Sequence, residues 1–129
     1  MNANQQLEEK RLVFQIVGCA MEVLNELGHG LREKTYERAL CVEFRLQKIN
    51  YSQQAIFPVI YKGEKVDDYI PDLIVEDRVV VDTKTIDAIG NVEIGKMLNY
   101  LHVTGLKVGL LINLKKSKLE WKRVVLSEH

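Results

Sequence analysis

The chain has no excess charge of either sign, no long apolar run and none of the common nucleotide or nucleophile motifs. Its 18 basic and 18 acidic side chains cancel, which argues against a protein that coats nucleic acid but still permits a local basic groove. No apolar run approaches the roughly 18 residues of a membrane-spanning helix, so we expect no membrane association. The lack of a phosphate-binding glycine loop and of a serine or cysteine nucleophile constellation argues against nucleotide-driven motors and acyl-transfer enzymes.

Cysteine is scarce, and the two that are present have no metal-site or redox spacing. Cys19 and Cys41 lie in apolar helical segments, and we interpret them as reduced core residues of a cytosolic protein. The polar N-terminus lacks the apolar stretch of a signal peptide, which also favours a cytoplasmic location. The length predicts one domain over residues 1–129, in which only residues 1–6 look like a loose tail.

Hydrophobic periodicity predicts three helices and several strands. Helices are expected at about 7–27, 31–48 and 91–104, and the first should end at Gly28 in a left-handed conformation. Strands are expected over 51–61 and 66–70, in a hairpin spanning 71–84, and over 107–113 and 119–126. The resulting order, α, α, β, β, β, β, α, β, β, indicates an α/β (α+β) fold with a mixed central β-sheet flanked by helices.

The motifs Pro71-Asp72 and Asp82-Thr83-Lys84 are the most informative part of the sequence. Antiparallel pairing about Asp77, with a loop of about three residues, sets Asp72 opposite Asp82. Side chains alternate along a strand, so Lys84 lies on the same face as Asp82. Carboxylates placed in this way repel each other and lose hydration, and a bound cation would offset both costs. The pattern is therefore typical of a divalent-metal phosphodiesterase site.

Two acids on the second predicted helix could add to this site. The face that carries Leu40 and Phe44 extends backward to Glu37 and Glu33, where a core-facing helix normally has apolar residues. A first-turn acid that interacts with the helix dipole would by itself explain Glu33. Asp72 could likewise be only a strand-entry residue.

The third predicted helix and the C-terminal strand hold further candidates. Lys96 and Tyr100 lie one turn apart beside the core stripe, where they could contact substrate or form a solvated face. Trp121-Lys122-Arg123 follows three lysines closely, and such a cluster could contact a nucleic-acid backbone or only border an amphipathic strand. Those lysines are Lys115, Lys116 and Lys118.

Several motifs resemble one known family. Gly30-Leu31-Arg32-Glu33-Lys34-Thr35-Tyr36 matches the motif that names the GxxExxY proteins, and the segments 71–75, 97–101 and 104–113 resemble that family in the same order. The resemblance covers about residues 13–125. The family is placed in the PD-(D/E)XK nuclease superfamily, which has a restriction-endonuclease-like core. The resemblance implies a nuclease that uses Mg²⁺ (or Mn²⁺) to hydrolyse phosphodiester bonds in nucleic acid, DNA more than RNA.

The resemblance also assigns roles to individual residues. Asp72 would be the metal-bridging carboxylate and Asp82 the second acid. Lys84 would orient or deprotonate the attacking water. Glu33 and the backbone carbonyl of Thr83 would complete the metal shell, since Mg²⁺ prefers oxygen ligands and keeps several waters.

Three further residues complete this expectation or depart from it. Glu37 could substitute for Glu33 or hold a metal-bound water. Lys96 stands where many relatives have glutamine, four residues before Tyr100; lysine can touch a phosphate but cannot accept a hydrogen bond from water. Relatives also more often have glutamate at the second acid, and the shorter Asp82 would shift the metal geometry.

Three functions follow as alternatives. The chain could be an active nuclease, a weak or inactive nuclease-fold module that binds nucleic acid or protein, or an interaction domain with vestigial acids. Because the net charge is zero, a homodimer or a nucleic-acid-processing partner protein could help to build the binding groove.

Overall fold

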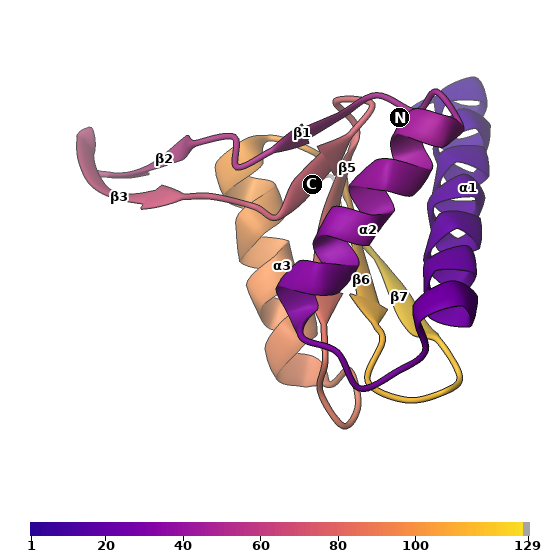
Figure 1. The fold of residues 1–129 in the computed structure, drawn as a ribbon. Coiled ribbons are helices and arrows are strands. Elements are labelled where there is room, and N and C mark those ends of the chain that lie inside the picture. Colours follow the sequence, from indigo (N-terminus) through magenta and orange to yellow (C-terminus); the bar gives the residue numbers. More distant parts are fainter. Residues whose placement is uncertain (128–129) are drawn as a thin grey trace.

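Three helices enclose a five-stranded sheet in the computed structural model, which describes residues 1–127 (Figure 1). Helices α1 and α2 cover one face of the sheet and α3 covers the other, so the sheet is flanked by helices, as predicted. In chain order the elements are α1 Ala3–Leu27, α2 Glu33–Leu46, β1 Tyr51–Gln53, β2 Phe57–Tyr61, β3 Glu64–Tyr69, β4 Leu73–Val75, β5 Val79–Lys84, α3 Asn91–Thr104, β6 Val108–Asn113 and β7 Glu120–Val125.

The sheet has the strand order β1-β4-β5-β6-β7 and is mixed, because β5 and β6 run parallel while the other neighbours run antiparallel. The β4–β5 hairpin pairs Leu73 with Val81 and Val75 with Val79. Continued by one residue, this register sets Asp72 opposite Asp82, as the hairpin motif predicted. The hairpin therefore brings the two acids together at one end of the sheet.

The central strand β5 is buried on both faces, which its run of valines indicates. Val79 and Val81 belong to the core beneath α1 and α2, whereas Val80 packs beneath α3 with Met97. Helix α3 lies so close to the sheet that a Cβ on Gly109 would be 2.4 Å from Met97 Sδ. A glycine in β6 is what permits this close approach.

The N-terminus differs from the prediction. Helix α1 begins at Ala3, so the expectation of a loose tail over residues 1–6 is wrong for most of that segment. The side chain of Asn2 accepts a hydrogen bond from the Gln5 backbone, and the Gln5 side chain accepts one from the Asn2 backbone. This capping box stabilises the first turn without any apolar contact, which hydrophobic periodicity cannot reveal. No helix within residues 1–127 is both long enough and apolar enough to span a membrane.

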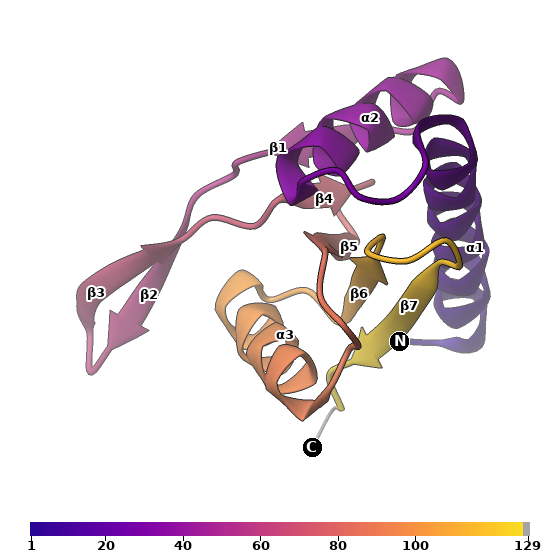
Figure 2. The ribbon, with the colours of Figure 1, turned by 60° about the horizontal axis from the view of Figure 1, so that its bottom comes forward.

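A second difference is the segment 51–61, which was predicted as one strand. It divides at Gln54, which has a φ of 57°, into β1 in the main sheet and β2 in a separate ribbon with β3. The β2–β3 ribbon, which we call the arm, projects from the sheet on the side away from α1 (Figures 1 and 2). The register shifts between Val59 and Ile60, directly after Pro58, a residue that is found in strands mainly at edges and bulges.

Candidate active site

The predicted acids and Lys84 lie together at the end of the sheet where β5 ends. Asp82 and Lys84 lie two residues apart at the C-terminal end of β5, and Asp72 directly precedes β4. Glu33 is the first residue of α2 and reaches the same end of the sheet from the layer above. Figure 2 shows this end of the molecule, with the start of α2, the end of β5 and the β6–β7 loop turned forward.

Consecutive residues of β5 and its extension hold the acids in place. The backbone N–H and the hydroxyl of Thr83 donate to Asp72 Oδ2 at 3.2 and 3.3 Å. Lys84 Nζ lies 3.1 Å from Asp82 Oδ2, which confirms that these two side chains share a face. The backbone N–H of Thr85 donates to Glu33 Oε1 at 3.2 Å. One strand end therefore orients three carboxylates.

The ionisation of this cluster has a clear physical cause. Burial raises the pKa of Asp82 to about 7, and the adjacent Asp72 raises it through a hydrogen bond and through its charge, against the opposing effect of Lys84. Burial acts to lower the pKa of Lys84, but the charges of Asp82, Glu33 and Asp72 outweigh it, so that this pKa is raised. A lysine with a raised pKa stays protonated at neutral pH. This favours an orienting, charge-stabilising role for Lys84 over removal of a proton from water.

Glu37 is buried one turn beyond Glu33, and its carboxylate is already engaged. Lys34 Nζ lies 3.1 Å from Glu37 Oε2, and Gln53 Nε2 donates to the same oxygen at 3.1 Å. A pocket of about 410 Å³ lies here, lined by Arg32, Glu33, Lys34, Glu37, Asp72, Thr83 and Thr85. Glu37 thus faces the same pocket as Asp72 and Glu33, but it holds β1 against α2.

Tyr36, the last residue of the motif that begins at Gly30, is a structural residue of the site to which the sequence analysis assigned no role. Its hydroxyl donates to the Gly28 carbonyl at 2.7 Å and accepts from the Leu31 backbone N–H at 3.1 Å. These bonds clamp the connection between α1 and α2, in which Gly30 has a φ of 103°. The clamp sets where α2 begins and hence where Glu33 points. The spacing of Gly30, Glu33 and Tyr36 therefore has a physical explanation.

Tyr69 was also missed. Its ring stacks on that of Tyr100, with centroids 4.0 Å apart and planes 12° from parallel, and joins the end of the arm to α3. Burial raises the pKa of Tyr69, and the charges of Asp82, Tyr100 and Asp72 raise it further, so this ring lies beside the acids. The only sequence signal was an aromatic residue three positions before Asp72. Lys96, on the turn of α3 before Tyr100, is exposed.

The donor set suits a hard divalent cation, but only part of it is assembled. Asp72 and Asp82 are close enough to disfavour double ionisation, and their oxygens are the ligands that Mg²⁺ prefers. Within residues 1–127, no three Asp, Glu, His or Cys side chains are arranged to hold a metal ion together. Glu33 is oriented by the hydrogen bond that its Oε1 accepts from the Thr85 N–H, and it is not arranged with the two aspartates around a common point. The residues therefore fit a metal held first by Asp72 and Asp82.

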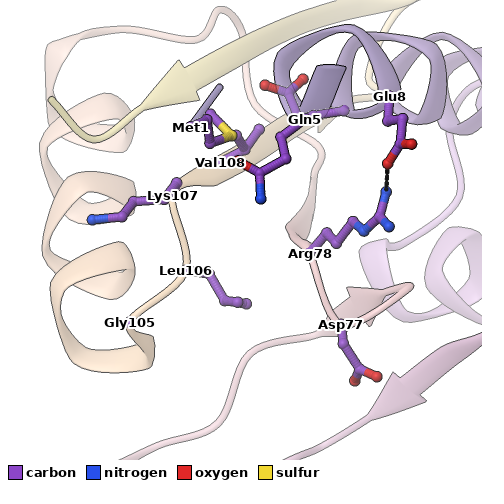
Figure 3. Close-up of a pocket in the computed structure, with 10 residues that line it drawn as sticks. Met1, Gln5, Glu8, Asp77, Arg78, Gly105, Leu106, Lys107 and Val108 are labelled. Atoms are coloured by element: carbon purple, nitrogen blue, oxygen red, sulfur yellow. Dashed lines mark hydrogen bonds and ion pairs between the residues drawn. The ribbon is translucent and has the colours of Figure 1, made fainter. Parts of the chain in front are cut away.

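A separate pocket lies at the opposite end of the sheet (Figure 3). It is formed by the start of α1, the β4–β5 turn and the segment 105–108. Arg78 reaches across it to Glu8, with Nη1 and Oε2 3.3 Å apart. None of the predicted site residues lines this pocket, so it is distinct from the acidic cluster.

Comparisons with known proteins agree with the fold. A family model described as PD-(D/E)XK nuclease superfamily matches residues 10–124. The solved structure of the protein SSO0001 has a TM-score of 0.58 at 12% identity, and the match covers 74% of this chain and 50% of that one. The chain thus spans only half the length of SSO0001.

A second solved structure, an alkaline exonuclease from Laribacter hongkongensis, has a TM-score of 0.50 at 10% identity, and the match covers 84% of this chain and 76% of the exonuclease. At these identities the two structures show a shared fold alone. A search of curated protein sequences finds no significant match. Because the family model spans nearly the whole chain, the chain belongs to the PD-(D/E)XK nuclease superfamily.

Proposed function

We propose that the protein is a nuclease that hydrolyses phosphodiester bonds in nucleic acid with the help of Mg²⁺ or Mn²⁺. The observation that carries this proposal is the adjacency of Asp72 and Asp82, with Lys84 Nζ 3.1 Å from Asp82 Oδ2. A largely buried aspartate whose pKa is raised by a second aspartate destabilises the fold at neutral pH, and such pairs occur mainly at functional sites. A cluster of this kind at a pocket edge is typical of a catalytic centre.

The chain's own residues divide the chemistry among them. Asp72 and Asp82, with the backbone carbonyl of Thr83, would hold the cation, and Glu33, which lines the same pocket as Asp72, is a further acid at the site. When bound, the cation would supply an acidified water and offset charge on the scissile phosphate. Lys84 stays protonated and stabilises the charge that develops on the phosphate oxygens. Tyr100 and its partner Tyr69 close the site on the α3 side.

We also propose a narrower family, a cellular location and a substrate for the protein. We infer that the chain belongs with the GxxExxY proteins, because Gly30, Glu33 and Tyr36 each have a use at the start of α2. We also infer one domain, a cytoplasmic location consistent with two free buried cysteines, and DNA rather than RNA as substrate. Lys96, exposed on α3, is proposed to touch a substrate phosphate as a point charge.

A cleavage assay tests the proposed activity directly. Purified protein is incubated with labelled single-stranded, duplex and branched DNA and with RNA, in Mg²⁺, in Mn²⁺ or in EDTA. We expect cleavage of at least one DNA substrate in either metal and none in EDTA. Loss of cutting on every substrate, together with tight metal-dependent binding, would instead support a nuclease-fold module that binds without cutting. The engagement of Glu33 by Thr85 is the observation that favours this second function.

A basic loop at the site edge is the best candidate for contact with the substrate backbone. Strand β6 runs parallel to β5, so the loop that follows it begins beside Lys84, and the Leu114 N–H donates to the Lys84 carbonyl at 2.9 Å. The loop carries three exposed lysines: Lys115, Lys116 and Lys118. Trp121 and Arg123 do not join this surface, because Trp121 packs on the core and Arg123 Nε donates to buried Glu9 at 3.0 Å.

Reversing two of these charges should weaken binding without affecting the acids. In an Asp72→Asn background, the Lys116→Glu/Lys118→Glu change should raise the Kd for DNA about 10-fold. The slope of log affinity against log salt should become less steep by about 1–2, since each lost phosphate contact removes about 0.9. Fluorescence anisotropy across a salt series measures both quantities. Lys10→Glu/Lys48→Glu, the same change of charge far from the acids, is the matched control, and an equal effect in both pairs would contradict a specific contact.

A further inference from the structure

Helix α1 is apolar on its outward face as well as on its core face. Leu7, Phe14 and Met21 are 59%, 68% and 48% exposed. Their spacing of seven residues is close to two helical turns, so they form one line along the helix. The buried residues of α1, such as Ile16 and Ala20, lie on the opposite side. A helix of this kind has a second apolar stripe that nothing in residues 1–127 covers.

Gly18 lies on the same line, between Phe14 and Met21. A Cβ added to Gly18 would meet no atom within 4 Å, so the stripe has an open notch at its middle. A large side chain next to a notch is self-complementary, because the side chain of one helix can enter the notch of another. The surface is therefore shaped for a second copy of itself.

Charge selects the orientation of that second copy. Arg11 flanks the stripe in its N-terminal half and Glu22 flanks it on the same side in its C-terminal half. In the part of the chain that the structure describes, neither side chain has an ion pair. Antiparallel helices bring residues of the same flank together, which sets Arg11 of one copy near Glu22 of the other. A parallel pair would instead set Arg11 near the partner's basic N-terminal half, which includes Lys10.

We propose that the protein forms a symmetric dimer in which α1 packs antiparallel against α1 of a second copy, crossing near Gly18. Phe14 of each copy then covers Gly18 and Met21 of the other, and two Arg11–Glu22 ion pairs flank the contact. Figures 1 and 2 both place α1 on the side of the molecule away from the arm. The two acidic sites consequently stay open, and the two arms point apart.

Sedimentation velocity at about 1–100 μM, without metal or nucleic acid, tests this dimer independently of the proposed nuclease activity. The wild-type protein should show a dimer, and Phe14→Asp should raise the dimer Kd about 100-fold or more. Leu46→Asp, at a position on α2 that is 71% exposed, is the matched control and should leave the dimer intact. A monomeric wild-type protein at every concentration, or a dimer that Phe14→Asp leaves unchanged, would overturn the proposal.

Charge reversal tests the orientation with variants altered only at exposed positions. Arg11→Glu alone and Glu22→Arg alone should each weaken the dimer about 10-fold, because each places like charges together. The double variant Arg11→Glu/Glu22→Arg should recover wild-type affinity within about 2-fold. Failure of the double variant to recover, with both single variants weakened, would exclude the antiparallel arrangement.

Discussion

Asp72→Asn should lower metal-dependent DNA cleavage by about 1,000-fold or more, because the change removes one of two adjacent carboxylates that would hold the cation. The Asn side chain is nearly the same size, and its amide oxygen can still accept from the N–H of Thr83. The fold should therefore survive while the negative charge is lost. Single-turnover cleavage with excess enzyme measures the effect on the chemical step, and circular dichroism verifies the fold.

Two further variants distinguish the loss of a metal ligand from a general loss of charge. Asp77→Asn makes the same chemical change at the exposed turn of the same hairpin and should leave cleavage within about 2-fold of wild type. Lys84→Ala should lower the rate about 100-fold or more while metal binding is retained, because Lys84 acts on the phosphate and does not hold the cation. Cleavage by Asp72→Asn at the wild-type rate would exclude the proposed centre, even if a nuclease activity were present.

Asp82→Asn should make the protein more stable at pH 8, by on the order of 2 kcal/mol or about 7 °C in Tm. The folded pKa of about 7 lies above the ordinary value of 3.8, so the folded state binds the Asp82 proton more tightly than the unfolded state does. The stability that comes from protonated Asp82 is complete below pH 4 and is lost as the pH rises through 7. Asn cannot ionise, so this loss should be absent from the variant.

Thermal melts from pH 4 to pH 8, with and without Mg²⁺ or Mn²⁺, test both the sign and the cause. The wild-type Tm should fall over this range more than that of Asp82→Asn. At pH 8 the metal should raise the wild-type Tm and leave the variant nearly unchanged, since a cation offsets the repulsion between Asp82 and Asp72. An Asp82→Asn protein that is less stable than wild type at pH 8 would contradict this account, and Asp77→Asn supplies the control for surface charge.

The hairpin at the heart of the site could be predicted because its determinants are local. The three-residue turn at Asp77 and the alternation of side chains place Asp72, Asp82 and Lys84 without knowledge of the rest of the fold. The apolar residues of the cores on the two faces of the sheet could be predicted for the same reason, because helical and strand periodicities are visible over short stretches of sequence. The third helix begins and ends at the expected residues.

The remaining features depend on partners far away in the sequence. Gln53 donates a hydrogen bond to Glu37, and the Thr85 N–H donates one to Glu33, 52 residues away in the sequence. Sequence periodicity cannot predict contacts of this kind. The sequence analysis did not predict the free-standing arm, because the strand is interrupted at Gln54 by a left-handed backbone conformation. Glutamine rarely adopts this conformation, so the residue type gives no sign of the break. Tyr69 was missed because its importance arises from stacking on Tyr100, which the fold brings to it.

The parallel pairing of β5 with β6 has a consequence for protein synthesis. Lys84 is anchored through its carbonyl to Leu114, so β5 has no lasting neighbour on that side until β6 and Leu114 have left the ribosome. Every acid of the cluster is translated well before this point. A nascent chain therefore contains the chemical groups of the site before it can assemble them, and the cluster forms only after β6 has been made.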